Sequence, residues 1–258
     1  MQFAEIAFGL ECLEQRTHLT AAPLAEYWPL VPGATWMYDT QGGGAGLGSW
    51  EKETILPRQK ITYGVKAFQR LGQSSDGDVN VSLETLSAGG LFGLLKRDQV
   101  AFQSPILFPQ LAAAGERLRT QGQADARVLD WFIVNNDFRA NVRVLGNESV
   151  KVPAGTFSTV KVRMTATVIV HRHMPKFVDP PNQATDVNGT IKITETEWLA
   201  QGVGAVKTIS KRHLNMKVNN NRRVKGELVP INIKRVVQDE VITKTLHSYS
   251  IPSGNSPA

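Results

Sequence analysis

The stretch Val150–Val170 reads VKVPAGTFSTVKVRMTATVIV, and it decides the fold class. From Val160 onward an apolar residue occupies every second position, and most of the residues between them are polar. A period of two over this length is typical of a strand with one face on a core and the other in water. Pro153 and Gly155 supply turn chemistry just before the alternation begins. The stretch therefore predicts a tight turn followed by a long antiparallel strand.

The same alternation occurs in several segments upstream, and clusters of Gly, Asn, Asp and Ser separate them. The alternating apolar positions are Ile61, Tyr63, Val65 and Ala67; Val79, Val81 and Leu83; and Phe138, Ala140, Val142 and Val144. Strands that recur every 10–20 residues without helices between them indicate one antiparallel sheet. We predict a mainly β protein with a single large curved sheet, either a half-barrel or a closed barrel, and a short N-terminal helix.

The expected domain organisation is a single β domain with an extension at each end. Residues 1–25 form the N-terminal extension, in which residues 3–16 have apolar positions at helical spacing. The antiparallel β domain spans residues 26–250, and residues 251–258 have the composition of a disordered tail.

Composition and charge restrict the class of protein. The chain has 258 residues, of which 41% are hydrophobic and 20% charged, as in a globular protein. Residues 1–150 contain 13 Lys or Arg and 16 Asp or Glu, whereas residues 151–258 contain 16 and 7. The second half is thus strongly basic. The single cysteine, Cys12, excludes an internal disulfide, and no apolar stretch is long enough for a membrane-spanning helix.

The N-terminus lacks the features of an export signal. Residues 1–16 carry three glutamates and no basic residue before the apolar positions, whereas a secretory signal starts with positive charge. Glu11 before Cys12 also departs from a lipidation site. Two alternatives stay open: a cytoplasmic protein, or a leader that lies upstream of Met1.

Four patterns suggest chemistry at first sight, and each has a simpler structural interpretation. Residues 42–48 are rich in glycine but match no phosphate-binding loop, so we expect a hairpin loop. The segment Asp76–Asn80 begins like a calcium loop but lacks its later Gly and Glu, so we expect a turn. We expect His171 and His173 to be exposed beside cations rather than to bind a metal. We expect the paired carboxylates of Glu195 and Glu197 to be solvated rather than catalytic.

These interpretations leave no catalytic group, cofactor site or metal site, so we expect a non-enzymatic protein. A hydrolase with an unrecognised site is the second alternative. A nucleic-acid partner is not expected, because residues 202–242 contain no Phe, Tyr or Trp for stacking on bases.

Three segments resemble parts of bacterial cell-envelope proteins of unknown function, which are secreted or lipid-anchored. Tyr27–Tyr38, YWPLVPGATWMY, resembles their Y-F-P-L-x-x-G-x-x-W-x-Y opening. Val150–Phe157, VKVPAGTF, resembles their P-A-G-T-F turn. Trp198–Lys207, WLAQGVGAVK, resembles their G-V-G-x-V-K segment. The order of the three segments agrees as well.

The resemblance implies a β-rich module similar to the half-barrel of lipoprotein carriers, located in the periplasm or at the outer membrane. It implies binding of an apolar, lipid-like ligand or a protein partner on the curved sheet. The alternative is a structural or assembly protein that pairs through a sheet edge.

Two sets of residues are candidates for binding. The concave face is expected to be covered either by the helix at residues 3–16 or by the apolar stretch 91–108, which has the composition of a movable flap. Any cleft left open would take the apolar ligand. The expected wall residues are Trp36, Phe92, Phe102 and Trp131. The simpler alternative is that these side chains fill the core. An anionic envelope surface is the expected partner of a basic patch formed by Lys211, Arg212, Arg222 and Arg223.

Overall fold

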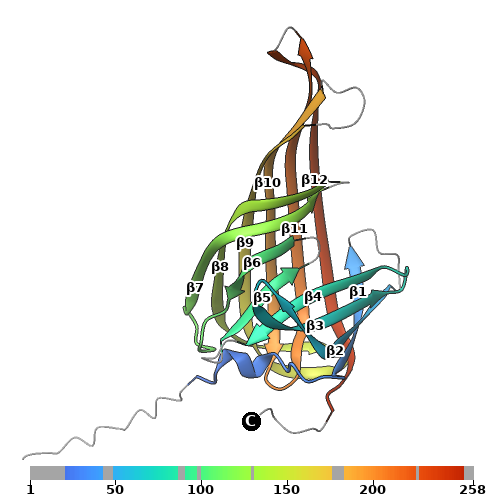
Figure 1. Ribbon diagram of the computed structural model, residues 1–258. Helices are drawn as coiled ribbons and strands as arrows, with labels where there is room; N and C mark the ends of the chain where they lie inside the picture. Colours follow the sequence, from blue (N-terminus) through green and yellow to red (C-terminus); the bar gives the residue numbers. More distant parts are fainter. Residues whose placement is uncertain are drawn as a thin grey trace, which may run out of the picture.

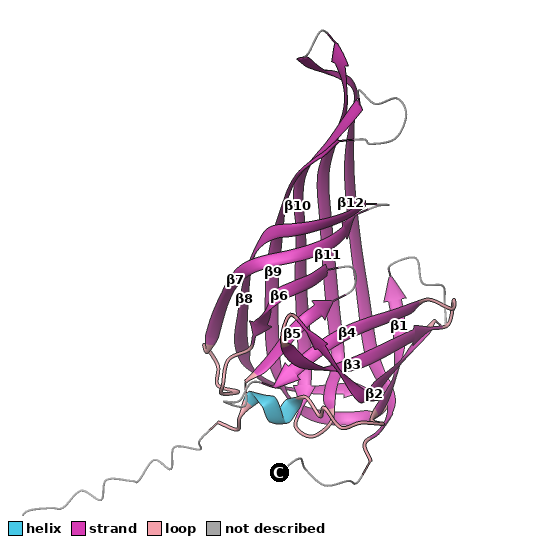
Figure 2. Cartoon of the chain, viewed as in Figure 1, coloured by secondary structure: helices cyan, strands magenta, loops and turns pink. Residues whose placement is uncertain are grey.

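A computed structural model describes residues 21–42, 49–86, 91–97, 100–128, 131–175, 183–224 and 227–252. These residues form one 3-10 helix and twelve strands, coloured by type in Figure 2. The elements are η1 (Leu24–Tyr27), β1 (Thr35–Gly42), β2 (Trp50–Thr62), β3 (Val65–Ser74), β4 (Val79–Leu86), β5 (Phe92–Arg97), β6 (Val100–Leu107), β7 (Arg117–Val128), β8 (Trp131–Val152), β9 (Gly155–Pro175), β10 (Gln183–Ala200), β11 (Gly204–Val224) and β12 (Glu227–Ser250).

The twelve strands form one antiparallel sheet that closes on itself. Each strand pairs with its neighbours in the chain, and β1 pairs with β12 to complete the ring. Thr35 lies opposite Ser250, and Gly42 lies opposite Ile242. The predicted fold class is confirmed, and of its two forms the chain adopts the closed barrel. The predicted N-terminal helix at residues 3–16 lies outside the described residues.

The strands of the barrel differ greatly in length. β8 to β12 have 18 to 24 residues each, whereas β1, β4, β5 and β6 have six to eight. In Figure 1 the long strands rise well beyond the short ones, so β1–β6 complete the barrel wall only in its lower part. β12 accordingly pairs with β1 only from Ile242 to Ser250.

The inward face of the long strands carries the predicted apolar alternation. All six alternating residues of β9 from Val160 to Val170 are at most 3% exposed, which confirms that part of the sequence prediction. The expected turn at residues 75–78 joins β3 to β4. His171, exposed on the outward face of β9, contacts Asn188 through its Nδ1 atom. The side chain of His173 lies outside what the structure describes.

An aromatic cluster closes the lower end of the barrel. The helix η1 is held there by hydrogen bonds from Leu24 N–H to Gln110 O and from Gly202 N–H to Glu26 O. It places Trp28 in a stack on Phe92, with ring centroids 4.2 Å apart, and both rings meet Phe108 edge-on. Such ring–ring contacts stabilise the fold beyond the gain from burying the apolar ring surface.

Residues 92–97 and 100–107 belong to the barrel wall. They form β5 and β6, which pair with each other and with the flanking strands β4 and β7. The expectation of a separate flap was therefore wrong, because the hydrogen bonds of these residues are used in the sheet. The helix η1 has only four residues. The described part of the chain therefore contains no helix that is long and apolar enough to cross a membrane.

Replacing Phe92 with Ala should lower the free energy of unfolding by about 3–5 kcal/mol, because it leaves a cavity beside Trp28 and Phe108. Urea denaturation followed by tryptophan fluorescence measures the change. Ile61→Ala is the control, since Ile61 is 69% exposed and its truncation should change stability by less than about 0.5 kcal/mol. Equal losses in the two variants would contradict the assigned aromatic cluster.

Candidate functional site

A cluster of charged side chains lies inside the barrel, between the short strands and the long ones. β2 contributes Glu51 and Glu53, β3 contributes Arg70, β4 contributes Glu84, and β12 contributes Lys244. Four of the five residues are less than 9% exposed, and Lys244 is partly buried. Because residues two apart on a strand share a face, Glu51 and Glu53 point inward together with the buried Ile55.

Arg70 joins three neighbouring strands. Its Nε and Nη2 atoms donate to the two carboxylate oxygens of Glu84 at 2.8 and 3.0 Å, which is a bidentate pair. Its Nη1 atom donates to Glu53 Oε2 at 3.2 Å. The guanidinium also lies 4.5 Å from the ring centroid of Trp36, a distance that allows cation–π attraction.

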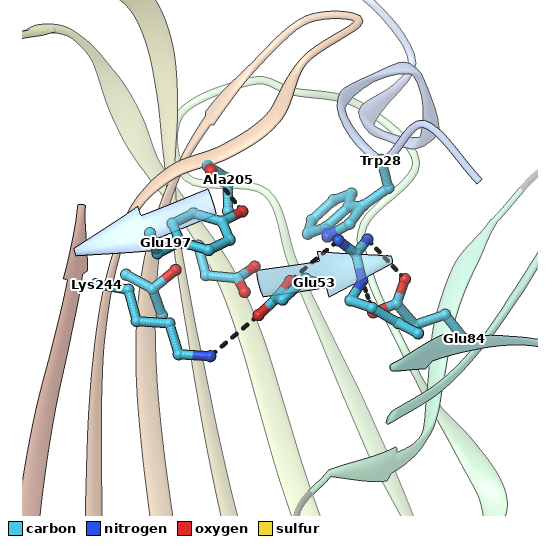
Figure 3. Close-up of a pocket in the computed structure, with 9 residues that line it drawn as sticks. Trp28, Glu53, Glu84, Glu197, Ala205 and Lys244 are labelled. Atoms are coloured by element: carbon cyan, nitrogen blue, oxygen red, sulfur yellow. Dashed lines mark hydrogen bonds and ion pairs between the residues drawn. The ribbon is translucent and has the colours of Figure 1, made fainter. Parts of the chain in front are cut away.

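Lys244 extends the cluster across β1 to the last strand. Its Nζ atom lies 2.8 Å from Glu51 Oε2 and 3.0 Å from Glu53 Oε1. Glu53 therefore bridges Lys244 and Arg70, as the dashed lines of Figure 3 show. The result is a continuous ionic network that links β12, β2, β3 and β4.

Glu195 and Glu197 reach the same interior from β10. Glu195 is only 4% exposed, and Glu197 is partly buried and labelled in Figure 3 beside Lys244. The expectation that this pair is solvated was wrong. The two carboxylates are buried because the inward face of β10 changes from apolar residues to carboxylates at the level where Lys244 supplies positive charge.

Two small cavities lie within the cluster. One, of about 20 Å³, is lined by Trp28, Tyr38, Glu197 and Ala205 together with the Arg70 network. The other, of about 70 Å³, is lined by Gly72, Asn80, Ser82, Glu195 and Ser210. A water molecule occupies about 10–15 Å³ on the same measure. The cavities therefore suit one or a few waters and are too small and polar for a lipid chain.

Burial and charge set the protonation of the groups around these cavities. Burial alone would lower the pKa of the Arg70 guanidinium, but Glu84 and Glu53 outweigh it and raise that pKa. Burial raises the pKa of the Tyr38 phenol well above its ordinary value of 10.0, and the charge of Glu53 adds to this effect. The Tyr38 hydroxyl donates to Ala205 O at 3.0 Å. Arg70 thus stays charged and Tyr38 stays neutral.

The residues expected to surround an apolar ligand are in packed contacts. Trp36 is buried and its Nε1 atom donates to Val203 O. Phe92 belongs to the lower aromatic cluster, and Phe102 packs against Phe138 with ring centroids 4.9 Å apart. None of the three lines either cavity. The side chain of Trp131 lies outside what the structure describes.

The residues of the expected basic patch are divided between two faces. Lys211 and Arg212 are consecutive on β11, so their side chains point to opposite faces of the sheet. Lys211 is exposed, whereas Arg212 is partly buried opposite Glu240. These two residues therefore do not share one surface. The side chains of Arg222 and Arg223 lie outside the described part of the chain.

The charged network was missed by sequence reasoning. Its members are Glu51, Glu53, Arg70, Glu84 and Lys244. One signal was present: Glu51 and Glu53 alternate in step with Ile55, so they had to share its buried face. Among the described residues, no group of three or more His, Cys, Asp or Glu is placed to hold a metal ion.

Comparisons with known proteins give a partial family match and two alignments with solved structures. Residues 134–217, which span most of β8 to β11, match the family described as DUF3108-like. A candidate lipoprotein from Parabacteroides distasonis ATCC 8503 aligns with a TM-score of 0.45 at 14% identity. A candidate exported protein with a YmcC-like fold from Bacteroides fragilis NCTC 9343 aligns with a TM-score of 0.36 at 11% identity. Each alignment covers 90% of this chain and 99% of the other. No curated protein matches the sequence.

Replacing Arg70 with Ala should lower the free energy of unfolding by about 3–5 kcal/mol, because Glu53 and Glu84 would lose a buried partner. Replacing Arg70 with Met and Glu84 with Leu together should recover part of the loss, since both members of the bidentate pair are then removed and Glu53 keeps Lys244 as its partner. Chemical denaturation measures both variants.

The control is Lys161→Ala, which removes the partly exposed pair between Lys161 and Glu148. It should cost no more than about 1 kcal/mol. A loss at Arg70 no larger than that of the control would mean that the network does not hold the strands together.

Stability should fall as pH rises above 10. The pKa of the Tyr63 phenol is raised to about 12 by burial and by its hydrogen bond to Asp125, and that of Tyr38 is raised as well. Unfolded phenols lose their protons near pH 10, so above that pH the folded state binds more protons than the unfolded state. This contribution is complete below pH 10 and is lost as pH rises through the folded pKa values.

Urea midpoints at pH 9, 10 and 11 measure the effect. Replacing both Tyr38 and Tyr63 with Phe should make the decline above pH 10 shallower. An unchanged slope in that double variant would show that other groups cause the decline.

Proposed function

We propose that the chain is a non-enzymatic assembly module that pairs with a second copy of itself through the edge of β12. The proposal rests on one observation: a long part of β12 pairs with a neighbouring strand on one side only. Pairing of β12 with β1 stops at Ile242. Within the described ranges, residues 227–241 pair with β11 alone. This edge presents backbone N–H and C=O groups that another strand can pair with.

The side chains of this edge are unusually apolar for an exposed strand. Ile233, Val237 and Val241 lie on the outward face and are 55%, 52% and 47% exposed. Natural edges are commonly protected by charges, proline or short length. Here Pro230 lies near one end, and residues 231–241 contain no proline. The edge is thus suited to a partner strand.

Charge complementarity favours a second copy as that partner. When two β12 strands run antiparallel with Val237 opposite itself, Arg235 lies opposite Asp239 of the second copy, and Lys234 lies opposite Glu240. Ile233 then lies opposite Val241 on the outward face. Opposite charges in such cross-strand pairs contribute about 0.2–1 kcal/mol each. Every charged residue of the overlap would meet its opposite.

Other features agree with this register. A pairing centred on Lys234 would place that lysine opposite itself, which is unfavourable. Asp239 contacts His213 at 2.7 Å, yet its side chain remains 72% exposed and can accept a second donor. The overlap ends at Val241, because beyond it β1 already occupies the edge of β12.

The proposal predicts a dimer that a single charge change weakens and a charge exchange restores. Asp239→Arg should weaken dimerisation about tenfold or more, because it turns two attractive pairs per dimer into repulsive ones. Combining Arg235→Asp with Asp239→Arg exchanges the charges and should restore the affinity. Sedimentation equilibrium over a range of concentrations measures each dissociation constant.

The control is Asp137→Arg, which makes the same charge change on the outward face of β8, where the side chain is exposed. It should leave the dimer unchanged. A protein that stays monomeric up to about 100 µM would contradict the proposal. A dimer that is equally sensitive to Asp137→Arg and Asp239→Arg would contradict the assigned edge.

Two expectations from the sequence stay predictions beside this proposal. One is binding of an apolar ligand, for which a saturable fluorescent lipid probe is the measurement. The other is location at the cell envelope, which was expected from the resemblance of three sequence segments and which cell fractionation measures.

A further inference from the structure

We propose that the outward face of β7, β8 and β9 binds a hydroxyl-bearing ligand with several phosphate groups. A hollow of about 750 Å³ lies on this face, far larger than the interior cavities. Its size is in the usual range for small-molecule sites, about 300–1,000 Å³. The lining side chains are Arg119, Gln121, Arg139, Asn141, Thr165 and Thr167.

Five arginines gather on this face of three adjacent strands. Arg119 and Arg139 line the hollow, and Arg117, Arg143 and Arg163 form a row next to it. In that row Arg117 lies directly opposite Arg143, and Arg143 lies directly opposite Arg163. Like charges in directly opposed positions destabilise a sheet. In the free protein, repulsion between these arginines is therefore unfavourable, and a bound anion would reduce it.

Among the described residues, no carboxylate forms an ion pair with any of these five arginines. Salt bridges are present elsewhere in the same part of the chain. Arg163 makes a hydrogen bond from its Nε atom to the Thr196 hydroxyl at 3.4 Å, which leaves its charge uncompensated. Guanidinium groups bind phosphate with two parallel hydrogen bonds. A ligand with several phosphates would meet several such groups at once.

The uncharged lining indicates that the ligand also carries hydroxyl groups. The Oδ1 atom of Asn141 is buried and accepts no hydrogen bond in the described structure. A buried acceptor without a donor costs free energy, which rotation of the Asn141 side chain toward a ligand O–H would recover. Thr165 and Thr167 on β9 and Gln121 on β7 offer further donors and acceptors around it. The lining contains no large apolar side chain, so a soluble ligand suits it better than a bilayer.

Isothermal titration with myo-inositol 1,4,5-trisphosphate, which carries free hydroxyl groups as well as several phosphates, tests the proposal in about 150 mM salt, since screening at that ionic strength suppresses weak long-range attraction. One ligand should bind per chain. The variant with both Arg119→Gln and Arg139→Gln should weaken binding about tenfold per arginine. Asn141→Leu should weaken binding of this ligand about threefold or more and leave the affinity for inorganic pyrophosphate unchanged, because pyrophosphate has no hydroxyl on carbon.

The matched control combines Lys211→Gln with Lys217→Gln, which removes the same charge from exposed positions on the same face of the sheet, on β11. It should change the affinity by no more than about twofold, as expected for distant screened charges. Equal weakening in the two double variants would show that only net charge matters, and would overturn the site. Absence of saturable binding would overturn it as well. Stronger binding to vesicles of phosphatidylcholine with phosphatidylglycerol than to the soluble ligand would overturn the assigned ligand class.

Discussion

Closure of the sheet between its first and last strands is the constraint on which the rest of the structure depends. Eight residues of β1 pair with the end of β12, and this junction turns a long meander into a ring with an interior. The ionic network lies just inside it: Lys244 on β12 reaches over β1 to Glu51 and Glu53 on β2, and Arg70 continues to β4. Charge attraction and backbone pairing therefore hold the same junction.

The unequal strand lengths shape the outer surface of the molecule in two places. Because β1 covers only the last part of β12, a long edge of β12 is left for another strand. Because the long strands continue beyond the short ones, their outward face is broad enough to carry an arginine-lined hollow at β7, β8 and β9. The proposed assembly edge and the proposed anion site lie on different strands, so occupation of one does not require the other.

Much of the architecture could be predicted from local patterns, whereas the interior could not. The alternation from Val160 to Val170 predicts a strand whatever its neighbours are, because the side-chain period belongs to the strand itself. Closure depends on Thr35 meeting Ser250, and no local pattern encodes a contact so distant in sequence. Glu195 illustrates the harder problem. A charged residue on a strand is normally solvated, and only the three-dimensional arrangement reveals that Lys244 and Arg70 make a buried carboxylate tolerable.

The β1–β12 junction also determines when folding can finish. Hydrogen bonding between neighbouring strands can begin as soon as each hairpin has left the ribosome, but the ring needs segments separated by nearly the whole chain. Lys244 and Glu53, which meet at this junction, are 191 residues apart. Long-range pairing of this kind is slow, because the entropy of closing a large loop is lost before any contact repays it. Until the last strand arrives, the edge of β1 and the apolar barrel interior remain open to other chains. A nascent barrel of this type has its greatest need for chaperone protection late in synthesis.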